Sequence, residues 1–431
     1  MLEPVEGAAP TGPAGHELIF LGYFSHFCCI PLTLGIFSHS SSAHGWTRRR
    51  MKMGNVEALE SWREALQQNS ERVLARTSDA LAESASLNPP PTDEPARLLE
   101  SASWAHATRR VDRARARRFL TEASPRPGDL VLARVDALGH HANLQLTDGR
   151  RRRLFPGDLI VVAYGHRYAC EQFEAEVPSA LGPCHLVAGG GIASRALSWH
   201  DRISRGPTRI TPLALLADES GSALNLAAFR IEERPGPARR PQVLGVLGTA
   251  MDAGKTQTAA FLMRGLRAAG YRTGYLKVTG TGAGGDTWLL HDAGADRVLD
   301  FTDAGLASTY LAPMDAIESA MVTLLDDMAA HDIDVVVMEV ADGVYQRETA
   351  ALIRSDAFRD CVDGIVLAGR DAMGVGAGVA ALTPSPAPLL AVSGLLSASP
   401  LQRREAEIAT ALPALNREEL AREDTARELL A

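Results

Sequence analysis

Residues 243–256 read Val-Leu-Gly-Val-Leu-Gly-Thr-Ala-Met-Asp-Ala-Gly-Lys-Thr. The apolar run 243–247 predicts a buried strand, which breaks into a tight loop at Gly248. A helical pattern then begins with the Gly-Lys-Thr of residues 254–256 and continues to Gly270. A strand, a glycine-bearing loop and a helix in this order direct backbone N–H groups at a phosphate. The lysine then reaches the β- and γ-phosphates, and the threonine hydroxyl is suited to hold Mg²⁺.

The pattern G-x-x-x-x-G-K-[ST] requires its first glycine at Thr249, whereas the glycine of this chain is Gly248, one residue earlier. The longer form G-T-x-x-x-x-G-K-T resembles the phosphate loop of the dethiobiotin synthetase family, although Ala250 stands where that family has aspartate. The loop residues expected to bind nucleotide are Gly248, Thr249, Ala253, Gly254, Lys255, Thr256 and Gln257.

Lysine is scarce in this chain. Only Lys52, Lys255 and Lys277 are present, and the other 41 of the 44 basic residues are arginine. Since arginine fills the ordinary basic positions, a retained lysine indicates a place where a compact ammonium is needed. Two of the three lie in or just after the phosphate-loop region, which favours a catalytic role for Lys255 and Lys277.

The bulk composition bounds the class of protein. A length of 431 residues predicts two or three domains. The net charge of −8 argues against an extended nucleic-acid surface, although local basic patches remain compatible with it. The five cysteines form no C-x-x-C pair, which argues against a disulfide framework or a zinc knuckle and favours cytoplasmic thiols.

Residues 1–52 differ from the rest of the chain. Residues 16–37 are apolar over about the length of a membrane span but are interrupted by polar residues and Pro31, and three arginines follow at 48–50. One interpretation is an anchor or signal segment. The favoured one is a non-functional or disordered extension ahead of a translation start at Met51 or Met53, with no membrane association.

Residues 53–125 are predicted to be a helical segment. Apolar residues recur at three- and four-residue spacings over 55–87, the prolines 89–91 end that pattern, and a second helix is predicted over 94–120. The second stretch carries six arginines. They suit either a solvated face or, less commonly, a contact with RNA or phosphate. Those arginines are Arg109, Arg110, Arg113, Arg115, Arg117 and Arg118.

Residues 126–232 are predicted to form a β-rich domain. Pro-Gly-Asp precedes an apolar run twice, at 127–129 and 156–158, which predicts a small barrel or sandwich. The glycines 189–191 suit a turn or the close approach of a ligand. The histidines and cysteines of this region show no metal-ligand spacing, so we expect no metal site there.

Residues 233–242 have the composition of a linker. The pattern of 243–415 then alternates strands with helices, which predicts a parallel α/β sheet of the P-loop NTPase type with helices on both faces, and 416–431 are assigned as a tail. The predicted strands are 243–247, 272–278, 297–301, 333–340, 363–369 and 388–393. The predicted helices are 255–269, 286–294, 314–331, 346–357 and 401–411.

The carboxyl ends of these strands are where ligands bind in open parallel sheets. Lys277 ends the second strand in a segment that resembles the Tyr-Lys-Pro segment of the dethiobiotin synthetase family, with Val278 in place of proline. That resemblance implies that Lys277 contacts substrate and phosphates. Asp286 follows a glycine-rich turn, and two roles stay open for it, as a Mg²⁺ ligand or as a helix N-cap.

Glu339 ends the apolar strand 333–339, as the metal-binding carboxylate of a phosphate-loop protein does. A buried carboxylate is costly without a partner, and the family resemblance implies that this glutamate holds Mg²⁺. Thr256, Glu339 and Asp286 are therefore the predicted metal ligands. Ser393, after the last strand, is assigned to the nucleotide base by the same resemblance. The predicted substrate residues are Thr279, Thr281, Asp300, Asp303 and Arg347.

Residues 243–410 also resemble the family that includes D-glutamate N-acetyltransferase. The leading prediction is an enzyme that binds ATP or GTP with Mg²⁺, phosphorylates a small carboxylate or carbamate and ligates it to an amine. One alternative is an acyltransferase that uses the loop for coenzyme A or another anionic donor. Another is a nucleotide-gated switch or chaperone. Relatives place sites at dimer interfaces, so a homodimer is expected.

Overall fold

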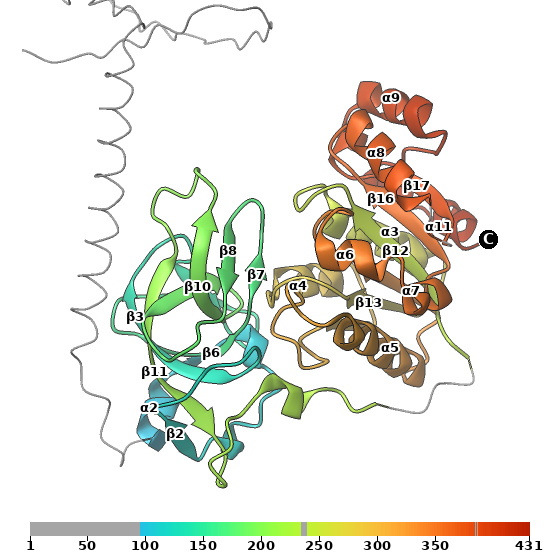
Figure 1. Cartoon of the computed structure of the whole chain (residues 1–431). Coiled ribbons are helices and arrows are strands. Elements are labelled where there is room, and N and C mark those ends of the chain that lie inside the picture. The colour runs from blue at the N-terminus through green and yellow to red at the C-terminus, as the bar shows by residue number, and fades with distance from the viewer. Residues whose placement is uncertain (1–94, 234–238, 384, 386) are drawn as a thin grey trace, which may run out of the picture. The chain divides into compact units, whose positions relative to one another are not determined.

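The computed structural model describes residues 95–233, 239–383, 385 and 387–431. The predictions for residues 1–52, and for a helix over 55–87, lie outside the described residues. All described residues belong to one compact unit of the chain, residues 79–431. Within it, a β-rich module precedes a module built on a parallel sheet (Figure 1).

The β-rich module is organised around strands that pair into a closed ring. β6 pairs with β3, β3 with β11, β11 with β9, β9 with β10, and β10 returns to β6. This closure selects the barrel of the two predicted architectures. The ring strands are β3 (Leu130–Ala137), β6 (Leu159–Tyr164), β9 (Cys184–Ala188), β10 (Ile192–Trp199) and β11 (Thr208–Ala217).

Shorter elements complete this module. The remaining strands are β1 (Ser103–Trp104), β2 (Arg118–Leu120), β4 (Asn143–Gln145), β5 (Arg151–Arg153), β7 (Arg167–Tyr168) and β8 (Phe173–Glu176), and the helical turns are η1 (His106–Thr108), η2 (Arg113–Arg115) and η3 (Leu226–Phe229). Alternate residues of the ring strands point to its two sides, so the module has two buried clusters. Val131 and Ala133 belong to one cluster, and Leu130 and Leu132 to the other.

The predicted helix over residues 94–120 is wrong. Helix α2 (Pro95–Ser101) ends after seven residues, and β1, the two turns η1 and η2, and β2 follow. The arginines at 109–118 therefore do not form one helical face. Three of them are spread over separate contacts, with Arg113 over the Trp104 ring, Arg115 over the Phe229 ring and Arg109 in ion pairs described below.

The second module is a six-stranded, all-parallel sheet with the strand order β14-β13-β15-β12-β16-β17. All six predicted strands are confirmed. They read as nearly continuous apolar runs because helices bury both faces of the sheet. They are β12 (Gln242–Gly248), β13 (Thr273–Lys277), β14 (Arg297–Asp300), β15 (Val335–Glu339), β16 (Gly364–Ala368) and β17 (Leu389–Ser393).

Helices cover the sheet in two layers, each with its own buried cluster. Along β12, Leu244 and Val246 pack with the first layer, and Val243 and Leu247 with the second. The first layer contains α3 (Lys255–Ala268), α4 (Gly285–Asp292), α10 (Arg417–Leu420) and α11 (Glu423–Leu430). The second contains α5 (Met314–Ala330), α6 (Arg347–Leu352), α7 (Asp356–Cys361), α8 (Ala372–Leu382) and α9 (Pro400–Thr410).

One sequence assignment in this module is corrected, and one helix was not predicted. Residues 416–431 are not a tail, because α10 and α11 bury Leu420, Ala426 and Leu429 with the α3 side of the sheet. The glycine-rich run 373–378 lies in helix α8. Asp371 caps that helix by accepting from Gly374 N, and Gly378 allows close packing, since a Cβ there would lie 2.8 Å from Leu367 Cδ2.

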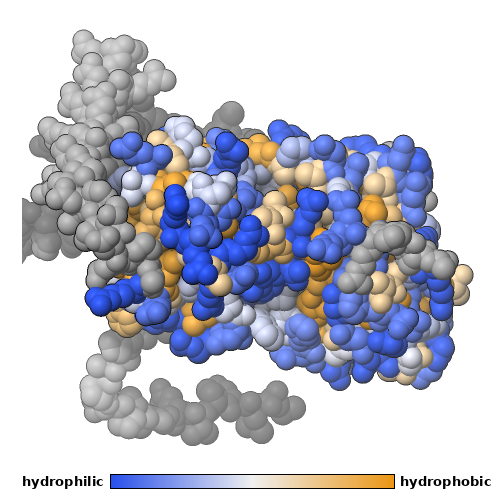
Figure 2. Space-filling model, turned by 90° about the horizontal axis from the view of Figure 1, so that it is seen from below, coloured by the Kyte–Doolittle hydropathy of each residue, from blue (hydrophilic) through white to orange (hydrophobic). Residues whose placement is uncertain are grey.

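The face shown in Figure 2 mixes hydrophilic and hydrophobic residues, with hydrophilic ones predominating. Since apolar atoms contribute much of any protein surface, this mixture does not mark an interface. Among the helices of the described residues, none is both long enough and apolar enough to span a membrane.

Candidate functional site

The loop between β12 and α3 forms a cradle of unused hydrogen-bond donors. Gly254, at the start of α3, has φ of 97°, a conformation that glycine adopts without steric cost. Within the described part of the chain, the backbone N–H groups of residues 254–257 donate to no acceptor. Because these donors stand at the positive end of a 14-residue helix, the loop is built to receive an anion.

Lys255 folds back over this loop and is only 4% exposed. Its Nζ donates to the carbonyl oxygens of Ala250 at 2.8 Å, Met251 at 3.1 Å and Asp342 at 2.8 Å. Burial lowers the pKa of Lys255, and the carboxylates of Glu339 and Asp342 oppose that shift. All three ammonium donors therefore rest on neutral carbonyls, which an anionic phosphate would replace with a charged acceptor.

The position of Gly248 follows from the path of the Lys255 side chain. A Cβ at residue 248 would lie 2.8 Å from both Cγ and Cδ of Lys255, so only glycine lets the lysine stem cross the strand end. Gly343 has a similar role, because its Cβ would lie 2.6 Å from the carbonyl oxygen of Thr249. The glycine thus stands at residue 248, one residue before its usual position, where the Lys255 stem leaves no room for a side chain.

Glu339 ends β15 and is 1% exposed. Its Oε1 accepts from the Thr256 hydroxyl at 3.3 Å, and its Oε2 accepts from the Tyr275 hydroxyl at 3.0 Å. Lys277 Nζ lies 3.3 Å from Oε1. The predicted metal ligands Thr256 and Glu339 are therefore in direct contact at the mouth of the loop.

Lys277 joins Glu339 to Asp286. Its ammonium forms a short ion pair with the Asp286 carboxylate, which lies in the first turn of α4. Burial disfavours the charged form, but Asp286 and Glu339 outweigh it and raise the pKa of Lys277. Asp286 is not the N-cap of α4, since Gly284 occupies that position, so the capping role left open for it is wrong.

The oxygen donors of this site fit Mg²⁺, which prefers hydroxyl, carboxylate and phosphate oxygens. The Thr256 hydroxyl and the Glu339 carboxylate supply two such donors beside the phosphate cradle. Among the described residues there is no group of three or more histidine, cysteine, aspartate or glutamate side chains arranged to hold a metal on their own. A cation here would therefore share its coordination with a bound phosphate or water.

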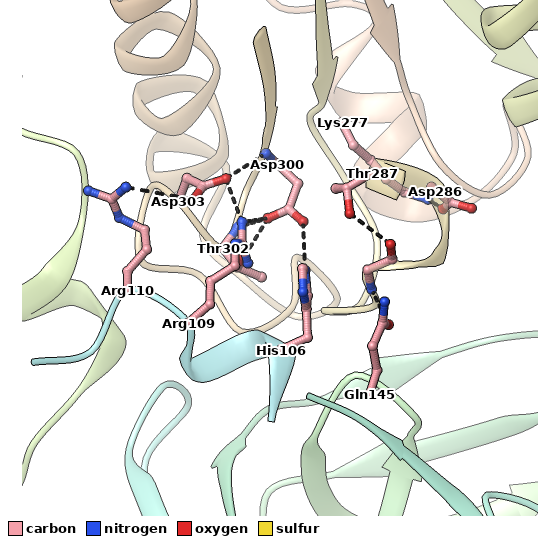
Figure 3. A network of polar contacts seen from close by, with 11 residues as sticks. His106, Arg109, Arg110, Gln145, Lys277, Asp286, Thr287, Asp300, Thr302 and Asp303 are labelled. Carbon is pink, nitrogen blue, oxygen red and sulfur yellow. Dashed lines mark hydrogen bonds and ion pairs between the residues drawn. The ribbon is translucent and has the colours of Figure 1, made fainter. Parts of the chain in front are cut away.

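Asp300 and Asp303, two of the predicted substrate residues, lie in ion pairs with the β-rich module (Figure 3). Arg109 Nη2 lies 2.5 Å from Asp303 Oδ2 and 3.3 Å from Asp300 Oδ1, and Arg110 lies 3.9 Å from Asp303. His106 Nε2 lies 4.0 Å from Asp300. Both carboxylates are buried, so in this structure they hold the two modules together rather than face a ligand.

The other predicted binding residues are distributed differently. Thr279 is buried and its hydroxyl accepts from Ala341 N at 2.8 Å, and Thr281 pairs with Ser308 through a β-bridge. The Arg347 side chain is 69% exposed and pairs with the buried Glu348.

Ser393 is 1% exposed. Its hydroxyl donates to the Leu415 carbonyl and accepts from Thr258, so it is directed into the protein rather than toward a nucleotide base.

Several residues at this site were not predicted from the sequence. Tyr275 reads as an ordinary strand residue, and its only signal is that it lies two positions before Lys277 and so on the same face. Gln145 of the β-rich module accepts from Gly284 N at 2.8 Å, and His106 leaves no room for a Cβ at Gly284. Asp342, by contrast, follows Glu339 in the sequence as a second candidate metal ligand, and it adopts a left-handed conformation with φ of 63° beside Lys255, a kind of strain that clusters at functional sites.

No protein-family model matches the chain, and no curated protein matches it. Some solved structures are similar to part of the chain. The signal recognition particle receptor FtsY from Elizabethkingia anophelis is 14% identical with a TM-score of 0.32, over 48% of this chain and 75% of that one. The complex of the same receptor with GDP is 15% identical with a TM-score of 0.31, and the match covers 46% of this chain and 66% of that one.

The signal recognition particle 54 kDa protein from Aeropyrum pernix K1, in complex with GDP, is 16% identical with a TM-score of 0.30. The match covers 47% of this chain and 50% of that one, so the chain spans half of that structure. TM-scores this low carry no argument about function. The class of protein rests instead on the chain's own parallel sheet and on the loop between β12 and α3, which together define a P-loop NTPase fold.

Proposed function

We propose that this protein is a Mg²⁺- and nucleotide-dependent enzyme that phosphorylates a small carboxylate or carbamate and then ligates it to an amine. The observation that carries the proposal is the contact of Thr256, Glu339 and Lys277 beside the unused N–H groups of the loop. These are the parts that phosphoryl transfer requires, namely an anion cradle, a metal-binding hydroxyl and carboxylate, and a second cation.

Each residue has a distinct role in this scheme. Residues 254–257 bind the phosphates through the backbone, and Lys255 exchanges its carbonyl partners for phosphate oxygens. Thr256 and Glu339 hold Mg²⁺, which neutralises phosphate charge. Lys277 lies next to the metal ligands, where it stabilises charge on the transferring group, and Asp286 keeps its ammonium in place.

The proposed reaction proceeds in two steps. A substrate carboxylate oxygen attacks the γ-phosphorus, the bond from phosphorus to the β-γ bridging oxygen breaks, and a nucleoside diphosphate leaves. The amine then attacks the acyl phosphate carbon and expels inorganic phosphate, with loss of one amine proton to solvent. The resemblance of residues 243–256 to the dethiobiotin synthetase family supports this order, with ATP or GTP as the donor.

The test is nucleotide consumption with and without a panel of small carboxylates and amines, followed by release of inorganic phosphate. Hydrolysis that rises with one carboxylate–amine pair supports the proposal. Binding of coenzyme A without nucleotide turnover would favour an acyltransferase instead, and turnover stimulated only by a protein partner would favour a switch or chaperone. The expected homodimer is checked by light scattering with and without nucleotide.

A further inference from the structure

Arg167, on β7 of the β-rich module, is a buried cation that forms no ion pair within the described part of the chain. It is 6% exposed, and its Nη2 donates to the neutral side chain of Gln172 at 2.7 Å. Its Nε has no hydrogen-bond partner, and it forms no ion pair with any described residue. Burying a charge in this way is costly unless an anion compensates it.

The Asp342 carboxylate acts on Arg167 electrostatically, but the two form no ion pair among the described residues. His140, His141 and Phe173 stack within 6 Å of one another, and His141 Nε2 is also buried without a partner. Burial, together with the charge of Arg167, lowers the pKa of His141 to about 3, so its imidazole is neutral. The Arg167 guanidinium, whose Nε is unused, therefore lies close to the unused Nε2 of His141, while the neighbouring His140 is exposed.

This cluster lies next to the proposed nucleotide site. Tyr168, the residue after Arg167, stacks on Tyr310 with ring centroids 5.5 Å apart, and the Tyr310 hydroxyl donates to Glu174 at 3.4 Å. Burial lowers the pKa of Arg167 to about 10, against the opposing effect of the Asp342 carboxylate. Asp342 is also the residue whose carbonyl accepts from Lys255 at 2.8 Å.

We propose that Arg167 binds an oxyanion, of the carboxylate or phosphate type, at the edge of the proposed nucleotide site. Such an anion would accept a hydrogen bond from the free Nε and supply the charge that the neutral Gln172 side chain does not. The assignment of this anion to the reaction rests on the proposed function, whereas the existence of the anion site does not. Two sources share this chemistry, the carboxylate of the small-molecule substrate and the γ-phosphate of the nucleotide.

The first experiment measures thermal unfolding of the full chain in chloride buffer at constant ionic strength, with inorganic phosphate, acetate or succinate added. It uses a Lys255→Met background, so that the phosphate loop contributes less to the response. We expect at least one anion to raise Tm in that background. Adding Arg167→Met should abolish the rise without lowering Tm in chloride alone, because a buried charge that has no ion pair among the described residues has been removed.

Arg195→Met, at an exposed position on β10, is the matched control and should keep the full anion response. The proposal is overturned if no anion raises Tm, if the rise survives Arg167→Met, or if Arg167→Met lowers Tm in chloride as the loss of a structural residue would.

A second experiment distinguishes the two sources by comparing ATP and ADP affinity in Arg167→Met, with Lys255 intact. A tenfold or greater loss for ATP, with ADP unchanged, assigns the anion to the γ-phosphate. Unchanged affinity for both, with the anion response lost, assigns it to the small-molecule substrate. Absence of nucleotide binding in the wild type would end the proposed function but leave the anion titration to decide this inference on its own.

Discussion

Lys277 and Glu339 are register partners at the carboxyl ends of adjacent parallel strands, and the ammonium lies 3.3 Å from a carboxylate that is 1% exposed. Asp300, at the end of the next strand, is the register partner of Lys277 on its other side. The carboxyl edge of the sheet therefore carries a row of charges. One end of the row reaches the phosphate loop through Thr256, and the other is fixed by the β-rich module through Arg109.

The ion pair between Lys277 and Glu339 gives the first prediction. Lys277→Met removes the cation from a buried carboxylate, so we expect the free energy of unfolding to fall by about 3–5 kcal/mol. The double substitution Lys277→Met with Glu339→Gln should recover most of this loss, since residue 339 then carries no charge that lacks its cation. Urea unfolding measures both, and a double variant no more stable than Lys277→Met would contradict the account.

The contact between the two modules gives the second prediction. Arg109→Met leaves the buried Asp300 and Asp303 without their main cation, and should lower the free energy of unfolding by about 3–5 kcal/mol. Arg110→Met is the matched control. Arg110 lies 3.9 Å from Asp303 and its side chain is 38% exposed, so its loss should cost less than about 1 kcal/mol. Equal losses of unfolding free energy for the two variants would mean that burial does not decide how much each ion pair contributes to stability.

Gly190 gives the third prediction. A Cβ at this position would lie 2.3 Å from the carbonyl oxygen of Gly282 in the other module, and backbone cannot move as a side-chain tip can. Gly190→Ala should therefore destabilise the protein by about 1–3 kcal/mol. Gly182→Ala, where a Cβ would meet nothing within 4 Å, is the control and should stay close to wild type in thermal unfolding.

His185 gives a prediction on pH. Burial, assisted by the charge of Arg209, lowers its pKa from 6.5 to about 4, and its Nδ1 accepts from Ala196 N at 3.1 Å, which requires an unprotonated nitrogen. The contribution of His185 to stability is complete above pH 6.5 and is lost as pH falls from 6.5 toward 4, because the unfolded chain binds the proton first.

Urea unfolding should be measured from about pH 4.5 to about pH 7, a range that covers most of this window. The free energy of unfolding should depend less on pH in His185→Asn than in wild type. The asparagine carbonyl can keep the bond from Ala196 without titrating. An unchanged pH dependence would show that His185 is already protonated in the folded protein at the acid end.

Much of the parallel sheet was predictable because buried parallel strands are short apolar runs, and helices separate them along the chain. The predicted charges at the strand ends, Lys277 and Glu339, fall side by side for the same reason. The helix over 94–120 was wrong because its periodicity was outweighed by pairing of β1 with β6 and β2 with β11. Helix α8 was not predicted, since glycine is a poor helix former, but Gly378 permits close packing on β16.

The role of the β-rich module could not be predicted from the sequence. Arg109 and Asp300 are 191 residues apart, and neither has a local pattern that names the other. The same holds for Gln145 and Gly284, whose hydrogen bond links a short strand to the loop that precedes Asp286. Contacts of this kind depend on how the two modules pack, which no local spacing encodes.

The most direct test of the central claim is calorimetric titration of the full chain with ATP, GTP and acetyl-coenzyme A, each with and without Mg²⁺. The variants are Lys255→Ala, which removes the ammonium from the loop, and Glu339→Gln, which removes the charge proposed to bind the metal. We predict binding of ATP or GTP that strengthens with Mg²⁺, is lost in Lys255→Ala and loses its Mg²⁺ dependence in Glu339→Gln. Binding of acetyl-coenzyme A alone, or of no nucleotide, would contradict the proposed phosphoryl transfer.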